Sequence, residues 1–191
     1  DSVALHERAA SDLRYIRETM ERATSFTAIS GAGYVIIGLT ALLAAWYASV
    51  QPEAVGWLLV WMGELVLAGV VVVWMTARKA RSQGERMRSY AGRKLVLAFL
   101  PPMVVGGLLT ASAYGAGDYR LIPGIWLGLY GAGVMTGGAY SVRIIPLMGA
   151  SFIALSGVAL LTDVSGDLLL ALGLGGLHLV FGAVIWRRYG G

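Results

Sequence analysis

The chain has 191 residues, of which 57% are hydrophobic and 14% charged, and its formal net charge is +4 at pH 7. So few charged side chains argue against a water-soluble globule and for a membrane protein. Because the chain contains no cysteine, disulfides, thiol catalysis and thiolate metal sites are excluded.

The first predicted element is an amphipathic cytoplasmic helix within residues 1–28. Its apolar residues recur at spacings of three and four and share one narrow stripe: Leu5, Ala9, Leu13, Ile16, Met20 and Ala23. Its charges are balanced, and pairs such as Arg14 and Glu18 stand four residues apart. We therefore expect residues 2–25 to pack on the membrane domain or on a partner, as in a homo-oligomer, and adsorption to lipid is the alternative.

Six apolar stretches follow, at residues 29–48, 55–77, 95–114, 121–140, 144–162 and 168–186. A helix needs about 20 residues to cross a hydrocarbon core of about 30 Å. The sequence therefore predicts an all-α integral membrane protein with a six-helix transmembrane bundle over residues 29–186 and a cytoplasmic tail at 187–191.

The basic residues predict the orientation of this bundle. Fourteen of the fifteen Lys and Arg residues lie before the first stretch, after the last, or in alternate gaps between them. Short basic loops stay on the cytoplasmic side, so both termini are expected there.

The loop at residues 78–94 holds seven of these cations and is expected to contact lipid headgroups or a partner: Arg78, Lys79, Arg81, Arg86, Arg88, Arg93 and Lys94. Because topology accounts for the positive charge, no nucleic-acid binding is expected.

Glycine is abundant, with 27 residues spread largely through the apolar stretches. The second stretch of each successive pair carries two glycines six apart: Gly63 and Gly69, Gly131 and Gly137, Gly176 and Gly182. Small residues let helices approach closely in lipid, so these six are predicted at helix contacts. The repetition predicts three helical hairpins.

Two segments resemble uncharacterised bacterial membrane proteins: YIRETMERATSFTAI at Tyr15–Ile29 and GGLHLVFG at Gly175–Gly182. The hairpin rhythm with short outer loops also resembles the HdeD family of bacterial acid-resistance membrane proteins, although that likeness does not cover the N-terminal helix. These resemblances imply location in a bacterial cytoplasmic (inner) membrane and, for the second, a role in stress resistance.

Two ionisable side chains are predicted inside the membrane, Glu64 in the second stretch and His178 in the sixth. Both helices are expected to run inward, which places the two groups at one depth. If the helices are neighbours, the carboxyl and imidazole groups can hydrogen-bond. Trp57 and Trp61 share the face of Glu64 and are expected to border a cavity. The pair is either a structural clamp or a proton-linked or ligand-binding site.

Other chemical signatures are missing from the sequence. One membrane histidine supplies a single axial haem ligand, and His178 with Glu64 makes only half a zinc shell, so no cofactor or metal is expected. No nucleophile motif or carboxylate pair suggests an enzyme. We expect a non-enzymatic stress-sensing or partner-binding membrane module. The alternative is a small-solute transporter, channel or transport subunit with a site near Glu64 and His178.

Overall fold

The computed structural model describes residues 8, 11–13, 15–16, 28–82, 84 and 90–190, and the regular elements within them are helical. In chain order they are α2 Gly31–Ser49, α3 Ala54–Ser82, α4 Tyr90–Ala116, the 3₁₀ turn η1 Tyr119–Leu121, α5 Ile122–Gly138, α6 Ile144–Leu161, α7 Gly166–Leu170, the π-helix η2 Ala171–Leu177 and α8 His178–Tyr189. Most of the predicted N-terminal helix lies outside the described residues, and so do Arg86 and Arg88.

In the described part of the chain, five helical units are long and apolar enough to cross a membrane: α2, α3, α4, α6 and the continuous unit Gly166–Tyr189. The prediction of an all-α integral membrane protein is confirmed. The predicted fourth span differs, because α5 has 17 residues and follows the separate turn η1. Pro123 lies in the first turn of α5, where its missing N–H and fixed φ favour a helix start.

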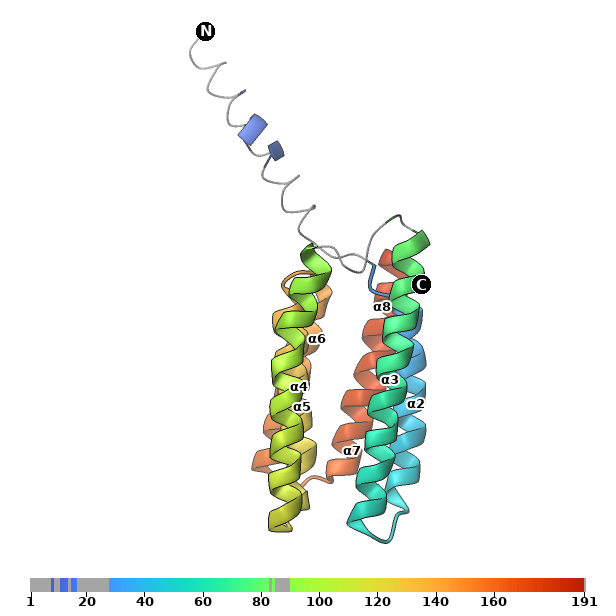
Figure 1. Ribbon diagram of the computed structural model, residues 1–191, viewed down its shortest axis with the longest axis vertical. Coiled ribbons are helices and arrows are strands. Elements are labelled where there is room, and N and C mark those ends of the chain that lie inside the picture. Colours follow the sequence, from blue (N-terminus) through green and yellow to red (C-terminus); the bar gives the residue numbers. More distant parts are fainter. Residues whose placement is uncertain are drawn as a thin grey trace.

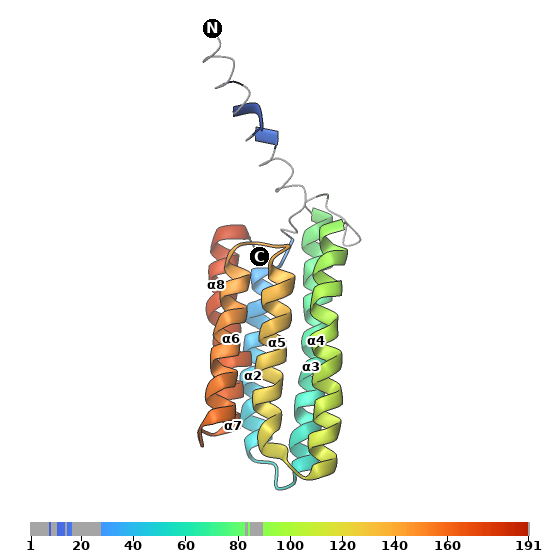
Figure 2. The ribbon, with the colours of Figure 1, turned by 90° about the vertical axis from the view of Figure 1, so that its left-hand side faces the viewer.

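The helices form two rows that face each other (Figures 1 and 2). One row consists of α4, α5 and α6, with α5 packed on both neighbours; the other consists of α3, α2 and α8, with α2 in the middle. The rows join where α6 meets η2 and α8, and α3 and α4 do not pack closely on each other at the opposite side. The fold is therefore closed along one side and open along the other.

Glycines determine which helices meet within each row. A Cβ on Gly38 of α2 would lie 2.9 Å from the carbonyl oxygen of Gly175, and one on Gly182 would lie 3.1 Å from that of Gly31. In the other row, a Cβ on Gly131 of α5 would lie 2.8 Å from the carbonyl oxygen of Gly149. Such close backbone approach maximises van der Waals contact in lipid, where the hydrophobic drive between helices is lost.

Of the six glycines predicted at helix contacts, three lie at such contacts and three do not. Gly131 and Gly182 lie at these contacts, and a Cβ on Gly137 would lie 3.3 Å from the carbonyl oxygen of Leu95. Nothing lies within 4 Å of a Cβ built on Gly63 or Gly69, and Gly176 faces only its own helix. The packing role predicted for these last three does not occur within the described structure.

Two of the three predicted hairpins pack as pairs in the structure, and the third does not. The pairs α2–α3 and α4–α5 pack along their length, whereas α6 makes few contacts with η2 and α8. The third pair is splayed because the glycines of α8 draw it against α2 and Gly149 draws α6 against α5.

Lys79 joins three chain segments at the end of the molecule that carries the C-terminus. Its Nζ donates to the carbonyl oxygens of Ile29 (2.9 Å), Tyr189 (2.7 Å) and Gly190 (2.9 Å), and the residue is 6% exposed. The sequence predicts contact of this side chain with lipid headgroups or a partner; the structure instead buries it against the end of α8. A cation there offsets the partial negative charge of the helix C-terminus. Arg78, Arg81 and Arg93 are exposed, as contact with headgroups requires.

Candidate functional site

A cavity of ≈ 450 Å³ lies between the two rows of helices. Its wall takes residues from both rows and is mostly aliphatic and aromatic. The polar or ionisable groups on it include Tyr34, Glu64, Thr76, Tyr130 and His178, and no Lys or Arg stands among the described lining residues. A few polar groups in a mainly apolar wall are typical of small-molecule sites.

The mouth of this cavity lies between α3 and α4. Leu65 and Val73 on α3 line the cavity and are 43% and 57% exposed, and Val96 and Leu100 on α4 line it and are each 53% exposed. All four side chains stand within apolar helices that are long enough to cross a membrane. The mouth therefore opens toward the hydrocarbon of the bilayer.

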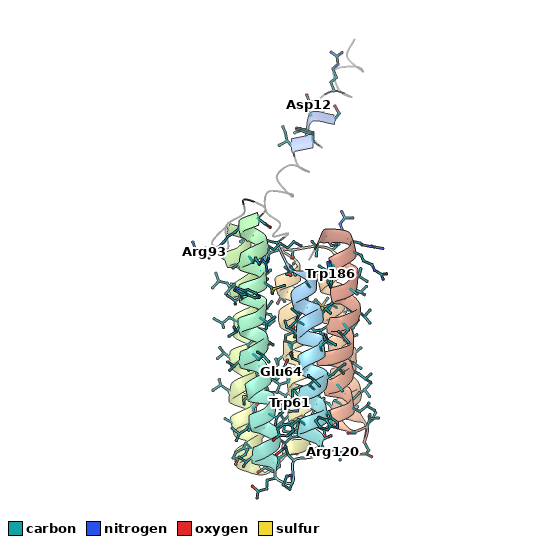
Figure 3. All side chains as sticks on the ribbon, turned by 90° about the vertical axis from the view of Figure 1, so that its right-hand side faces the viewer. Asp12, Trp61, Glu64, Arg93, Arg120 and Trp186 are labelled. Carbon is teal, nitrogen blue, oxygen red and sulfur yellow. The ribbon has the colours of Figure 1, made fainter. Side chains whose placement is uncertain are left out.

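Glu64 forms part of the cavity wall where α3 meets α2. Its Oε1 is hydrogen-bonded to Oγ1 of Thr40 on α2 over 2.8 Å, and the residue is 8% exposed. Figure 3 shows Glu64 between α3 and α2, with Trp61 one turn away on α3. Glu64 also borders a second hollow of ≈ 290 Å³, which Thr40 and Tyr47 line with it. The carboxyl group thus stands in the wall between two spaces.

His178 lies at the centre of an aromatic cluster to which several helices contribute. Its Nε2 is 2.7 Å from the hydroxyl oxygen of Tyr130 on α5, and its ring centroid is 5.5 Å from those of Tyr34, Tyr130 and Phe152. Phe99 of α4 packs edge-on against Tyr130 at 5.7 Å. These rings surround the imidazole, which is 1% exposed, and Tyr34, Phe99, Tyr130 and His178 also line the cavity.

The π-helix η2 sets the position of this histidine. Its sequence, ALGLGGL, holds three glycines and ends one residue before His178. Gly173 admits the Leu127 side chain, whose Cδ2 is 2.5 Å from a Cβ built there. Short π segments inside α-helices are often found at functional sites, because they shift the side chains that follow.

The predicted pair of Glu64 and His178 shares the cavity without a direct bond. Helix α2 packs between α3 and α8, and no hydrogen bond or ion pair joins the two residues. Each binds a side chain that the sequence did not single out, Thr40 for Glu64 and Tyr130 for His178. The carboxyl group of Glu64 and the imidazole of His178 are therefore two separate polar groups on one mainly apolar wall.

Trp57 and Trp61 extend the wall on the Glu64 side, with ring centroids 6.4 Å apart. Nε1 of Trp57 donates to Oδ1 of Asp167 on α7 over 2.6 Å, which ties α3 to the opening turn of the last span. Nε1 of Trp61 is buried and has no hydrogen-bond partner among the described residues. An unpaired buried donor is unfavourable, and an acceptor held in the cavity would satisfy it.

Nδ1 of His178 is the second buried nitrogen without a partner in the described part of the chain. The imidazole lies beside the carbonyl groups of Gly173 and Leu174, neither of which is a hydrogen-bond partner of Nδ1. With a proton on Nδ1 directed at those carbonyls, Nε2 accepts the hydrogen bond from Tyr130.

Replacing Tyr130 with Phe tests whether this hydrogen bond holds the cluster together. Phe retains the contacts with Phe99 and Phe152 but leaves Nε2 of His178 buried without a donor, so we expect a loss of about 1–3 kcal/mol. Thermal unfolding in detergent measures it. The control is Tyr47→Phe, because Tyr47 is 53% exposed. Equal melting temperatures for the two variants would show that the bond contributes nothing.

In the described residues, no group of three or more His, Cys, Asp or Glu side chains is placed to hold a metal ion. Among the described residues that line the cavity there is one carboxyl and one imidazole, and the imidazole is already hydrogen-bonded to Tyr130. The wall as built favours an organic molecule with much apolar surface.

Comparison of the chain with protein-family models, curated proteins and solved structures finds no match.

Proposed function

We propose that this chain is a non-enzymatic membrane protein that binds a small apolar or amphipathic molecule taken sideways from the bilayer. The observation that carries the proposal is the ≈ 450 Å³ cavity, whose mouth lies between α3 and α4 at the level of the apolar spans. Its size and mainly apolar wall fit the range of about 300–1,000 Å³ for ligand sites.

The ligand is expected to be elongated. Along α3 the wall runs from Trp57 to Thr76, and a helix covers about 28 Å over that distance. This length approaches the thickness of the hydrocarbon core. An acyl or isoprenoid chain, or a molecule with a comparable apolar body, suits such a site better than a compact polar solute.

The proposed topology has six spans, with η1 and α5 together forming the fourth. Residues 119–138 are then long enough to cross, and the Lys and Arg distribution supports a topology with both termini on the cytoplasmic side, which we propose is that of a bacterial inner membrane. Exposed Trp74 and Trp186 near that side, and exposed Trp46 near the other, suit the interfacial positions of tryptophan.

The sequence leaves two function classes open, a stress-sensing or partner-binding module and a small-solute transporter, channel or transport subunit. The cavity favours the latter, as a binding or transport subunit. The first class, a stress-sensing or partner-binding module, rests on residues 2–25 and is a separate proposal. Comparing the oligomeric mass of the full chain with that of a chain truncated before residue 28 tests it, because a helix that holds a homo-oligomer together must be present for the larger mass.

A matched pair of glycine variants tests the proposed function. Gly69 lines the cavity and Gly63 does not, and nothing lies within 4 Å of a Cβ built on either. We expect Gly69→Phe to block the cavity and Gly63→Phe to leave it open. Binding of tritiated hexadecanol, a neutral elongated probe, to purified immobilised protein is measured by scintillation proximity.

The expected result is saturable binding to the wild type and to Gly63→Phe, and at least tenfold weaker binding to Gly69→Phe. Equal binding to the two variants would show that the probe is held by the detergent or by the outer surface of the protein. The proposed function would then lose its basis.

A further inference from the structure

The described cavity wall holds a carboxyl group but no Lys or Arg to pair with it. Glu64 is the carboxyl group that lines the cavity, and no Lys or Arg is found among the described lining residues. Lys79 is held by three carbonyl oxygens at the inner end of the molecule, and His178 is bonded to Tyr130. No cation of the described chain forms an ion pair with Glu64. When Glu64 is ionised, a positively charged ligand would supply its countercharge.

The same wall is rich in aromatic rings, namely Tyr34, Trp57, Trp61, Phe99, Trp126 and Tyr130. Trp61 stands one helical turn from Glu64, so its ring and the carboxyl group face neighbouring parts of the wall. Aromatic faces attract organic cations, and tryptophan does so most strongly. The wall therefore offers a cation both a carboxyl group and rings.

The contacts of Thr40 indicate which protonation state of Glu64 fits its surroundings. Oγ1 of Thr40 lies 2.8 Å from Oε1 of Glu64, 3.0 Å from the carbonyl oxygen of Ile37 and 3.2 Å from that of Ile36. Oγ1 is placed to donate to all three oxygens, but its one hydrogen cannot serve both Oε1 of Glu64 and the backbone carbonyls of its own helix. The carbonyls only accept, so these contacts are all satisfied when Glu64 carries a hydrogen and donates it to Oγ1. A neutral carboxyl also suits this depth.

We propose that the cavity binds lipophilic organic cations in exchange for the proton of Glu64. The inference rests on the proposed function, because it names the ligand class of that cavity. The cation enters between α3 and α4, the carboxyl group releases its hydrogen to water as a proton, and the resulting carboxylate pairs with the cation. Charge balances, since one positive charge enters the site and one leaves it.

The pH dependence follows from this exchange. Because protons and cations compete for one carboxyl group, affinity for the cation rises with pH, by up to about tenfold per pH unit while Glu64 is mainly neutral. The other titratable groups in the described part of the cavity wall are Tyr34 of α2, Tyr130 of α5 and His178 of α8, and Tyr47 of α2 faces the second hollow. None of these carries a positive charge while His178 accepts from Tyr130.

Tritiated tetraphenylphosphonium, measured by scintillation proximity on the purified full-length chain, is a suitable probe. Proton release is followed in parallel with an indicator dye in weakly buffered detergent solution. The variant is Glu64→Gln, and the control is Glu53→Gln, since Glu53 lies in the exposed α2–α3 connection. Tritiated hexadecanol binding to the wild type serves as the reference for the cavity itself.

We expect the wild type and Glu53→Gln to bind the cation with release of about one proton, and Glu64→Gln to bind at least tenfold more weakly. If the wild type binds the cation without releasing a proton, or with an affinity that does not change with pH, the proposal is overturned. This test uses the wild type alone, so it does not depend on whether the Glu64 variant folds. If hexadecanol binds and the cation does not, the inference fails and the proposed function stands. If neither binds, both fail.

Discussion

Lys79→Met should markedly destabilise the protein, by about 3 kcal/mol. The methionine keeps much of the apolar stem but removes the donor shared by the carbonyl oxygens of Ile29, Tyr189 and Gly190. Carbonyl groups left without a donor in a buried setting are unfavourable, and the end of α8 also loses a favourable charge. For a chain of this size, the loss corresponds to a melting temperature lower by roughly 6–12 °C.

The matched control is the neighbouring cation. Arg78 is exposed, and its guanidinium lies 6.0 Å from the ring centroid of Trp74, so Arg78→Met should remove less than about 1 kcal/mol. Unfolding of both variants is followed by circular dichroism in one detergent. If Lys79→Met and Arg78→Met melt together, the ammonium group does not tie α3 to the ends of α2 and α8.

Gly182→Ala should also destabilise the protein, because it separates α2 from α8. The added Cβ would lie 2.9 Å from Cβ of Tyr34 and 2.9 Å from the backbone nitrogen of Val35. Backbone atoms cannot move aside as a flexible side chain can, so the helices must shift, at a cost of about 1–3 kcal/mol. The shift would also disturb Tyr34, whose ring packs 5.5 Å from that of His178.

The sign of the effect should reverse at Gly63. Nothing lies within 4 Å of a Cβ built there, so Gly63→Ala gains the helix preference of alanine, about 0.5–1 kcal/mol. Thermal unfolding of the two variants in parallel checks the pair. Destabilisation by Gly63→Ala would indicate that this glycine packs against another chain.

The sequence predicts the membrane class and most spans well because both rest on local properties. Length and hydropathy identify apolar helices without knowledge of their neighbours. The fourth span shows the limit of this approach, since α5 covers Ile122–Gly138 within the predicted 121–140 and a separate 3₁₀ turn precedes it. A pattern of apolar residues does not register that change in backbone geometry.

Helix neighbours are harder to predict, since lipid-facing and buried residues are equally apolar in a membrane. Gly63 and Gly69 match Gly131 and Gly137 in spacing, yet only the latter pair meets another helix. The seven-residue spacings of Gly31 with Gly38 and of Gly175 with Gly182 mark the real α2–α8 contact, and they were available in the sequence.

Only part of the candidate site can be predicted from the sequence, again because an apolar pattern does not show which helices meet. Glu64 and His178 stand out because ionisable groups are rare in apolar spans. Their partners, Thr40 and Tyr130, are ordinary residues of such helices, and only the packing of α2 against α3 and of α5 near η2 brings them into contact. The insertion of α2 between α3 and α8 separates the two ionisable groups.

Native mass spectrometry of the protein released from lipid nanodiscs tests the central claim, that the cavity holds a molecule taken from the bilayer. We expect a wild-type chain that keeps one small molecule after the surrounding lipid is stripped, the same adduct on Gly63→Phe, and a bare chain for Gly69→Phe. A bare wild-type chain, or an adduct retained by Gly69→Phe, would contradict the account.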